Sequence, residues 1–328
     1  MLNVCAYNAT RLPLRAARGT PSALQWRRWM SVRPELRETT EISRPKVTVA
    51  ELQRMHKARQ PIAMLTAYDY PTAKAASANP LIDIVLVGDS LAQVCLGYQS
   101  TTQLTLDDMI HHARAVMRGT THPLVVADMP FGSFGVSTED TLRNAVRLMQ
   151  ASGADAIKME GGAELAGAVQ RLAHVGIPVM AHIGLMPQRA MLSGFRVQGR
   201  TAAGAARVLA DALALQHAGA FAVVLEAVPR NLGAHLTARL RIPTIGVGAG
   251  NLTSGQALVW DDIMGTWSGH QAKFVRRFAD CQAERDAGVQ RFAEAVKERS
   301  FPRPLEESYG DVPAEEWAKF LQAQQESQ

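Results

Sequence analysis

The sequence predicts an α/β protein folded as a (β/α)8 barrel, because short apolar runs alternate with amphipathic helical stretches. Most runs are continuously apolar, as expected of parallel strands buried on both faces. Eight such runs favour a barrel. An open, doubly wound sheet is the alternative, since the eighth run is the weakest. The expected strands are Ile62–Thr66, Ile82–Val87, Leu124–Ala127, Ala156–Met159, Val179–Ile183, Ala222–Leu225, Thr244–Val247 and Ala257–Trp260.

Helical periodicity fills the stretches between these runs. Apolar residues at the spacing i, i+3, i+4 and i+7 mark one face of a helix, and they are Leu142, Ala145, Val146 and Met149. Ser137, with Asp140 three residues later, precedes this face in the pattern of a capping box. The same apolar spacing recurs over residues 205–212. The stretches between the strands are therefore expected to be helices.

The composition is that of a folded protein with a basic leader. Hydrophobic residues make up 47% of the 328 residues and charged residues 20%, which is enough to bury a core. A run of 18 apolar residues, as a membrane-spanning helix needs, does not occur. The net charge is +5, but residues 1–34 hold six arginines and no acidic residue. The rest of the chain is close to neutral, so its charge does not indicate a nucleic-acid partner.

The leader has the composition of a mitochondrial transit peptide, since it combines arginine with serine, threonine and alanine and lacks acids. A secretory signal would need a compact apolar run. We expect the protein to reach the mitochondrial matrix and the leader to be cleaved after Met30. A disordered basic tail with another role is the alternative interpretation.

Three regions are expected along the chain: a leader over 1–40, a catalytic barrel over 41–300 and a C-terminal extension over 301–328. The extension is rich in Pro, Glu and Gln, with one helical stretch near residues 314–322. The three cysteines, Cys5, Cys95 and Cys281, include no close pair. A disulfide framework or a structural zinc site is therefore not expected.

Ionisable side chains stand at or near the ends of five expected strands. Parallel strands of a barrel all end at one rim, where active sites assemble. These side chains are Asp89, Asp128, Lys158, Glu160, His182 and Glu226.

Each of these residues, taken alone, has a structural explanation as a helix cap, a loop anchor or a core histidine. Lys158 is the hardest to explain in this way, because an unpaired buried ammonium is costly and needs an anion, either Glu160 or a ligand. Carboxylates on neighbouring strands repel each other unless a cation lies between them. Oxygen ligands favour Mg²⁺ over zinc. Together the residues predict a divalent-cation site at the rim.

A glycine-rich segment, 246–251, follows the seventh expected strand. It lacks the lysine of a phosphate-binding loop and the full spacing of a dinucleotide fingerprint. We therefore favour a tight turn that shapes the rim, with a phosphate-binding loop as the alternative.

Eight ordered blocks of the sequence resemble the ketopantoate hydroxymethyltransferase family, over about Thr48 to Phe301. The leader and the tail resemble the extensions of eukaryotic members. Met186, Ser254 and Ala272 depart from the family's usual Thr, Asp and Pro. The blocks are Thr66–Tyr70, Val87–Ser90, Ala127–Phe131, Ile157–Gly162, His182–Leu185, Val197–Arg200, Leu225–Glu226 and Gly246–Gly250.

The resemblance implies a barrel of the phosphoenolpyruvate mutase/isocitrate lyase type, a homodecamer, and one Mg²⁺ per subunit. It makes Asp89 and Asp128 the metal contacts, with Glu160 as a third carboxylate that reaches the ion through water. The family positions match Glu226 to the proton acceptor, and His182 to a residue of the pocket. The 2-oxo acid would be held by Asp89, Ser90, Asp128 and Lys158.

The implied reaction transfers a hydroxymethyl group from 5,10-methylenetetrahydrofolate, a co-substrate, to 3-methyl-2-oxobutanoate, giving 2-dehydropantoate in pantothenate synthesis. A metal-stabilised enolate is the expected intermediate, formed when Glu226 removes the C3 proton. Lys158 is expected to stabilise the developing negative charge. Two alternatives stay open: a lyase of the same superfamily, and a barrel without catalysis that serves as a binding scaffold.

Overall fold

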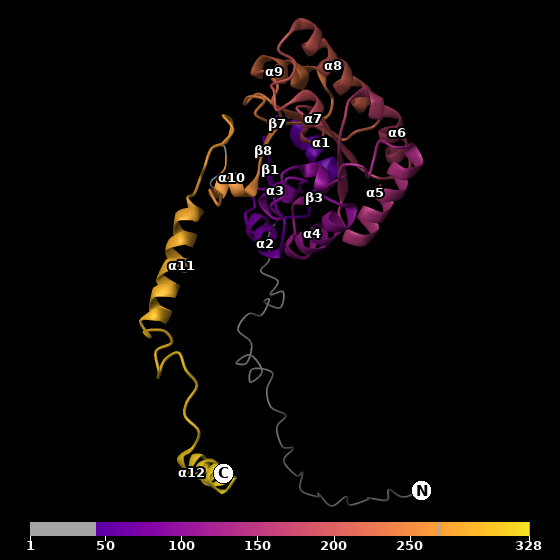
Figure 1. Cartoon of the computed structure of the whole chain (residues 1–328). Helices are drawn as coiled ribbons and strands as arrows, with labels where there is room; N and C mark the ends of the chain where they lie inside the picture. Colours follow the sequence, from indigo (N-terminus) through magenta and orange to yellow (C-terminus); the bar gives the residue numbers. More distant parts are fainter. Residues whose placement is uncertain (1–43, 268, 270, 328) are drawn as a thin grey trace, which may run out of the picture. The chain divides into compact units, whose positions relative to one another are not determined.

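The computed structural model describes residues 44–267, 269 and 271–327, and within them parallel strands close into one barrel in chain order (Figure 1). The predicted leader and its cleavage point lie outside the described residues. The strands are β1 (Ile62–Thr66), β2 (Ile84–Val87), β3 (Leu124–Asp128), β4 (Ala156–Glu160), β5 (Val179–Gly184), β6 (Ala222–Glu226), β7 (Thr244–Val247) and β8 (Gly255–Leu258).

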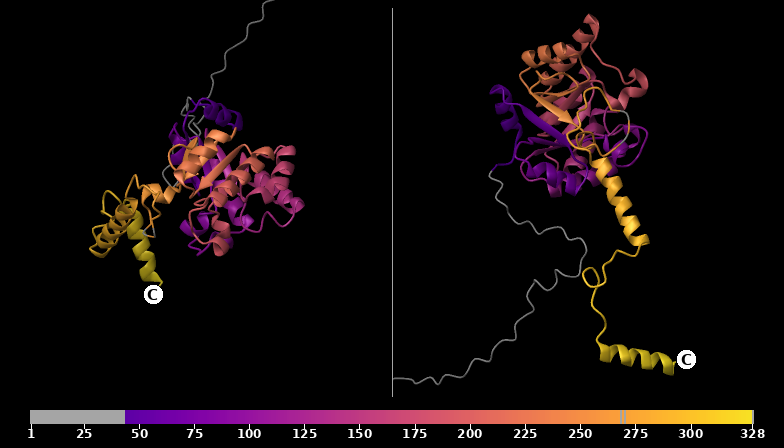
Figure 2. Two further views of the ribbon diagram at one scale, coloured as in Figure 1. Left: turned by 90° about the horizontal axis from the view of Figure 1, so that it is seen from above. Right: turned by 90° about the vertical axis from the view of Figure 1, so that its left-hand side faces the viewer.

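Helices lie outside the barrel, and Figure 2 shows this arrangement from two further sides. They are α1 (Val49–Lys57), α2 (Tyr70–Ala78), α3 (Leu91–Val94), α4 (Leu106–Gly119), α5 (Thr138–Ser152), α6 (Ala166–His174), α7 (Ala190–Ser193), α8 (Ala202–His217), α9 (Arg230–Arg239), α10 (Trp260–Met264), α11 (Cys281–Lys297) and α12 (Ala314–Glu326). Short 3-10 helices are η2 (Thr101–Gln103), η3 (Ala163–Leu165) and η4 (Pro187–Arg189). None of the described helices is long and apolar enough to cross a bilayer.

The predicted barrel is confirmed, and the open sheet is excluded, because β8 pairs with both β7 and β1. The eighth strand lies two residues earlier than predicted. Gly255 and Gln256 carry no apolar signal, yet Gly255 pairs with Ile62 on one side and Ile245 on the other. Trp260, predicted to end this strand, instead starts α10.

The second strand begins two residues later than predicted. The amide of Ile82 donates to the carbonyl of Asn79, so Ile82 belongs to the turn after α2.

The helices predicted around residues 142–149, 205–212 and 314–322 are confirmed, whereas the stretch between β7 and β8 is a turn without a helix. Ser137 caps α5 by accepting a hydrogen bond from the amide of Asp140. The hydroxyl of Ser137 donates back to the Asp140 carboxylate, in place of the main-chain bond that a capping box has. Residues 205–212 lie inside α8, and the helical stretch of the extension is α12, which has no buried residue.

The side chains inside the barrel change character along its axis. The inward positions of the strands nearer their amino ends are apolar, and they include Ile84, Leu124 and Ala222. A second apolar cluster fills the space between the strands and the helices. Charged side chains begin two residues beyond the last of these inward apolar positions, at Asp128 after Val126 and at Glu226 after Val224, so the apolar layers form a floor beneath them.

Candidate active site

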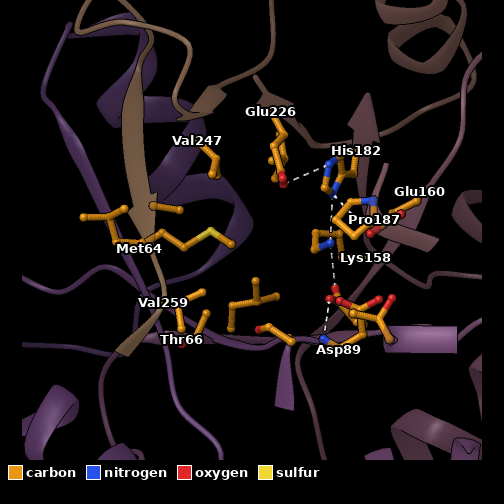
Figure 3. Close-up of a pocket in the computed structure, with 18 of the residues that line it drawn as sticks. Met64, Thr66, Asp89, Lys158, Glu160, His182, Pro187, Glu226, Val247 and Val259 are labelled. Atoms are coloured by element: carbon orange, nitrogen blue, oxygen red, sulfur yellow. Dashed lines mark hydrogen bonds and ion pairs between the residues drawn. The ribbon is translucent and has the colours of Figure 1, made fainter. Parts of the chain in front are cut away.

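A cavity of about 240 Å³ opens where the strands end. All seven side chains predicted for the site line it, and they are Asp89, Ser90, Asp128, Lys158, Glu160, His182 and Glu226. In the close-up of Figure 3, Lys158, His182 and Glu160 lie on the side opposite Met64 and Val247. We call the six ionisable residues among the seven the polar wall. Met64, Val247 and Val259 form the apolar wall.

Two aspartates from adjacent strands meet at one end of the polar wall. Asp128 is the last residue of β3, and Asp89 lies just beyond β2. The amide of Asp89 donates to Oδ2 of Asp128 over 2.9 Å. Burial, together with the neighbouring Asp89 charge, raises the pKa of Asp128 to about 6, although Lys158 opposes the shift. This end of the cavity therefore concentrates negative charge.

Lys158 and Glu160 both come from β4, two residues apart, so both side chains point into the barrel. Asp128 pairs with Lys158 across the sheet, and Nζ of Lys158 lies 3.0 Å from Oδ1 of Asp128. Burial opposes the charged form of Lys158, but the three surrounding carboxylates outweigh it and raise the pKa. Lys158, only 4% exposed, therefore carries its charge at neutral pH.

His182 connects Lys158 to Glu226. Nζ of Lys158 donates to Nδ1 of His182 over 3.1 Å, and Nε2 lies 2.8 Å from the carbonyl oxygen of Leu185. Burial and the nearby Lys158 charge place the pKa of His182 well below its usual value. The partners assign a neutral imidazole that accepts at Nδ1 and donates from Nε2.

Glu226 ends β6, beside Val247 in the register of the two strands. Its Oε2 lies 3.4 Å from Nε2 of His182, and its side chain is 16% exposed. Burial raises the pKa of Glu226 to about 8, with Lys158 opposing and the aspartates adding to the shift. A carboxylate with a pKa this close to neutral is suited to accept a proton.

Two residues that the sequence did not single out hold this site in place. Gln188, in η4, donates from Nε2 to Oδ2 of Asp89 over 3.0 Å. The hydroxyl of Tyr68, which is buried, lies 2.8 Å from Oγ of Ser90. Both stand in short segments within or beside the predicted blocks, but an uncharged polar residue in a loop gives no sequence signal of its own.

The residues present fit a hard divalent cation bound by two carboxylates. Oδ1 of Asp128 is buried and accepts no hydrogen bond of good geometry from the described residues, although Nζ of Lys158 lies 3.0 Å away. Across the described part of the chain, no three acidic, imidazole or thiol side chains gather at metal-ligand spacing. One or two carboxylates, with water and substrate oxygens, are the usual protein ligands of Mg²⁺. Oε2 of Glu160 accepts a hydrogen bond from the main-chain amide of Gln188.

The glycine-rich segment forms the turn between β7 and β8. Gly248 and Gly250 have φ values of +67° and +85°, which favour glycine. A Cβ on Gly248 would lie 2.7 Å from the ring of Phe274, which lines the cavity. The turn therefore shapes the rim, as predicted.

Fold and site together define a (β/α)8-barrel enzyme with a lysine and carboxylates at the strand ends. A solved structure of similar fold is 2,3-dimethylmalate lyase, a phosphoenolpyruvate mutase/isocitrate lyase superfamily member. It has a TM-score of 0.51 and 17% identity, and the match covers 85% of this chain and 99% of that one. This likeness agrees with the predicted (β/α)8-barrel fold.

Sequence comparison then identifies the family. The profile of ketopantoate hydroxymethyltransferase matches residues 46–304. A protein of Heliobacterium modesticaldum named 3-methyl-2-oxobutanoate hydroxymethyltransferase is 48% identical over 266 residues, covering 81% of this chain and 96% of its own. One of the same name from Emericella nidulans is 45% identical over 283 residues, covering 85% and 80%. The chain belongs to the ketopantoate hydroxymethyltransferase family and is an enzyme of that class.

Proposed function

We propose that this enzyme transfers a hydroxymethyl group from 5,10-methylenetetrahydrofolate to C3 of 3-methyl-2-oxobutanoate, giving 2-dehydropantoate for pantothenate synthesis. The observation that carries the proposal is a largely buried glutamate of raised pKa that shares one cavity with a charged lysine and two adjacent aspartates. The names of the relatives support the choice of the oxo acid.

Glu226 is the base in this proposal. Removal of the C3 proton is the difficult step, because that carbon carries two methyl groups. Glu226 faces the cavity beside Val247, so its carboxylate meets the reacting carbon in a partly apolar setting. Burial strengthens the carboxylate as a base, since desolvation disfavours its charged form.

His182 orients the base and the lysine. Its Nε2–H is directed to the Leu185 carbonyl and lies near Oε2 of Glu226, while Nδ1 receives Lys158. A neutral imidazole does not compete with Glu226 for the substrate proton as a second base of similar strength, because its pKa is held low. It fixes both neighbours without adding charge.

Lys158 supplies the permanent positive charge of the site. It lies between Asp128 and His182, with its ammonium in the cavity wall. In our proposal it pairs with the carboxylate or the developing enolate oxygen of the oxo acid. A cation placed where negative charge develops stabilises the transition state more than the ground state.

Asp89 and Asp128 would hold Mg²⁺, with Glu160 reaching it through water. When bound, Mg²⁺ would act as a Lewis acid that draws charge onto the keto oxygen of the substrate. In our proposal Ser90, whose hydroxyl contacts that of Tyr68, donates a hydrogen bond to the substrate carboxylate. Phe195 and Phe274 line the same cavity and are 73% and 38% exposed, which leaves an apolar mouth for the larger folate.

Exchange of the C3 proton tests the proposal most directly. In D₂O, with Mg²⁺ and 3-methyl-2-oxobutanoate but without folate, the substrate should lose its C3 proton signal in the NMR spectrum. Adding methylenetetrahydrofolate should then produce 2-dehydropantoate. Neither a lyase of other substrates nor a scaffold needs to remove that proton, so a C3 signal that persists in D₂O, with no 2-dehydropantoate formed after methylenetetrahydrofolate is added, contradicts the proposal.

Location and assembly form a separate part of the proposal. The arginine-rich, acid-free residues 1–34 support import into the mitochondrial matrix. The family resemblance supports a decamer. A fluorescent protein fused after residue 43 should enter mitochondria, and light scattering of the whole protein should give ten subunits. Cytosolic fluorescence, or a smaller particle, would contradict the respective part.

A further inference from the structure

Gln188 joins three strand ends from a loop that follows a fourth strand. It lies in η4, after β5, and is only 5% exposed. Its side-chain Nε2 donates to Oδ2 of Asp89 over 3.0 Å and to the carbonyl oxygen of Met129 over 3.1 Å. Its main-chain amide donates to Oε2 of Glu160 over 3.0 Å. One residue thus contacts the segments after β2 and β3 and the last residue of β4.

The chemistry of these bonds suits a site that must stay negative. Asp89 lies close enough to raise the pKa of Asp128 and of Glu160. A lysine or arginine in place of Gln188 would cancel charge that a cation needs. An amide instead satisfies the carboxylate oxygens while leaving the full charge in place. The bond to Oδ2 of Asp89 also leaves Oδ1 as the oxygen that can face an ion.

We propose that Gln188 is a positioning residue that sets the affinity of the site for Mg²⁺ by fixing the carboxylate of Asp89. The inference rests on the proposed function, in which Asp89 is a metal ligand. Residues that orient metal ligands from behind typically change metal affinity by about 10–100-fold when they are replaced.

The main-chain and side-chain bonds of Gln188 can be separated by mutation. Gln188→Met keeps the length of the side chain and the main-chain bond to Glu160, but removes both donors to Asp89 and Met129. Gln198→Met is the matched control. Gln198 lies in the same connection between β5 and α8, and its side chain donates only to the carbonyl oxygen of Arg196 among the described residues.

The experiment measures Mg²⁺ binding to each full-length variant by calorimetry, without substrates, together with the melting temperature in EDTA. We expect Gln188→Met to bind Mg²⁺ about 10–100-fold more weakly, while Gln198→Met binds as the wild type does. Gln188→Glu should bind more weakly than the wild type as well, because its carboxylate, when ionised, repels Asp89 and cannot donate.

A double-mutant cycle adds a measurement, the coupling of two substitutions in their effect on Mg²⁺ affinity, that a loss of packing alone would not change. In the Asp89→Asn background, Gln188→Met should cause little further loss of Mg²⁺ affinity, because its target is already changed. Unchanged affinity in Gln188→Met, with or without a lower melting temperature, would overturn the inference and leave the proposed function standing. A wild-type protein that binds no Mg²⁺ would contradict the metal in the proposed function itself.

Discussion

The two walls of the cavity differ in what they contribute and in how they are built. The polar wall is a continuous chain of contacts from Glu226 through His182 and Lys158 to Asp128. Figure 3 marks the part from Glu226 through His182 to Lys158 with dashed lines. The apolar wall, with Met64 and Val247, makes no such contacts and excludes water instead. The comparison suggests a division of roles for the proposed chemistry: the polar wall supplies the charges, while burial raises the pKa of Glu226, the proposed base.

The largest expected effect comes from removing the base on the polar wall. Glu226→Gln keeps the size and polarity of the side chain but cannot accept the C3 proton. A positioned base typically contributes about 10²–10⁴-fold in rate, so kcat should fall at least about 10²-fold, with substrate binding largely retained. Proton exchange in D₂O and steady-state kinetics measure the loss. Unchanged turnover would remove Glu226 from this role.

The second prediction concerns stability and contrasts the two walls. Lys158→Met leaves Asp128 buried without its cation, and such a loss typically costs about 3–5 kcal/mol of unfolding free energy. Met64→Leu on the apolar wall conserves volume and should cost less than about 1.5 kcal/mol. Urea unfolding in EDTA measures both.

The double variant Lys158→Met/Asp128→Asn is the control for this prediction. It should regain part of the loss, because the buried charge is gone. If Lys158→Met and Met64→Leu lowered the free energy of unfolding equally, the stability of the polar wall would not depend on its ion pair.

The third prediction is a pH dependence set by Glu226. The base must be ionised, and its pKa is raised to about 8, so kcat/KM should rise with pH and level off above about 8. An unshifted glutamate would have reached its plateau near about pH 5.5. A flat profile between about pH 6 and 8 would therefore show that the burial of Glu226 does not control the rate.

The same shift affects folding. Because the folded protein holds the Glu226 proton more tightly than the unfolded chain does, its contribution to stability falls as pH rises from about 4.5 to about 8. Glu226→Gln should lack that part of the slope.

The difference between the walls also explains what the sequence can predict. Charges that interrupt apolar runs stand out, so Asp128, Lys158 and Glu226 are identifiable from the order of residues alone. Their meeting at one rim follows from the parallel barrel. Residues of the apolar wall, such as Val247, cannot be told from core residues by type.

Other features leave only weak signals in the sequence. Gln188 resembles a solvent-exposed loop residue by type, and only its three bonds reveal its place in the site. The bounds of β8 depend on pairing at Gly255, which has no side chain to reveal it. In polar loops and at glycine-containing strand ends, tertiary contacts therefore determine the structure, and sequence patterns do not predict it.

The smallest expected effect comes from making the apolar wall slightly polar. Val247→Thr conserves the shape of the side chain and places a hydroxyl on the strand beside Glu226. The hydroxyl can donate to the carboxylate and stabilise its charged form, so the pKa of Glu226 should fall, by less than about one unit. The rising limb of kcat/KM should move to lower pH by the same amount, while the plateau falls slightly because a weaker base is formed.

Val259→Thr, on the same wall but outside the β6–β7 pairing, is the matched control and should leave the limb in place. A limb that stays at about 8 in Val247→Thr would mean that the apolar wall excludes water without tuning the base.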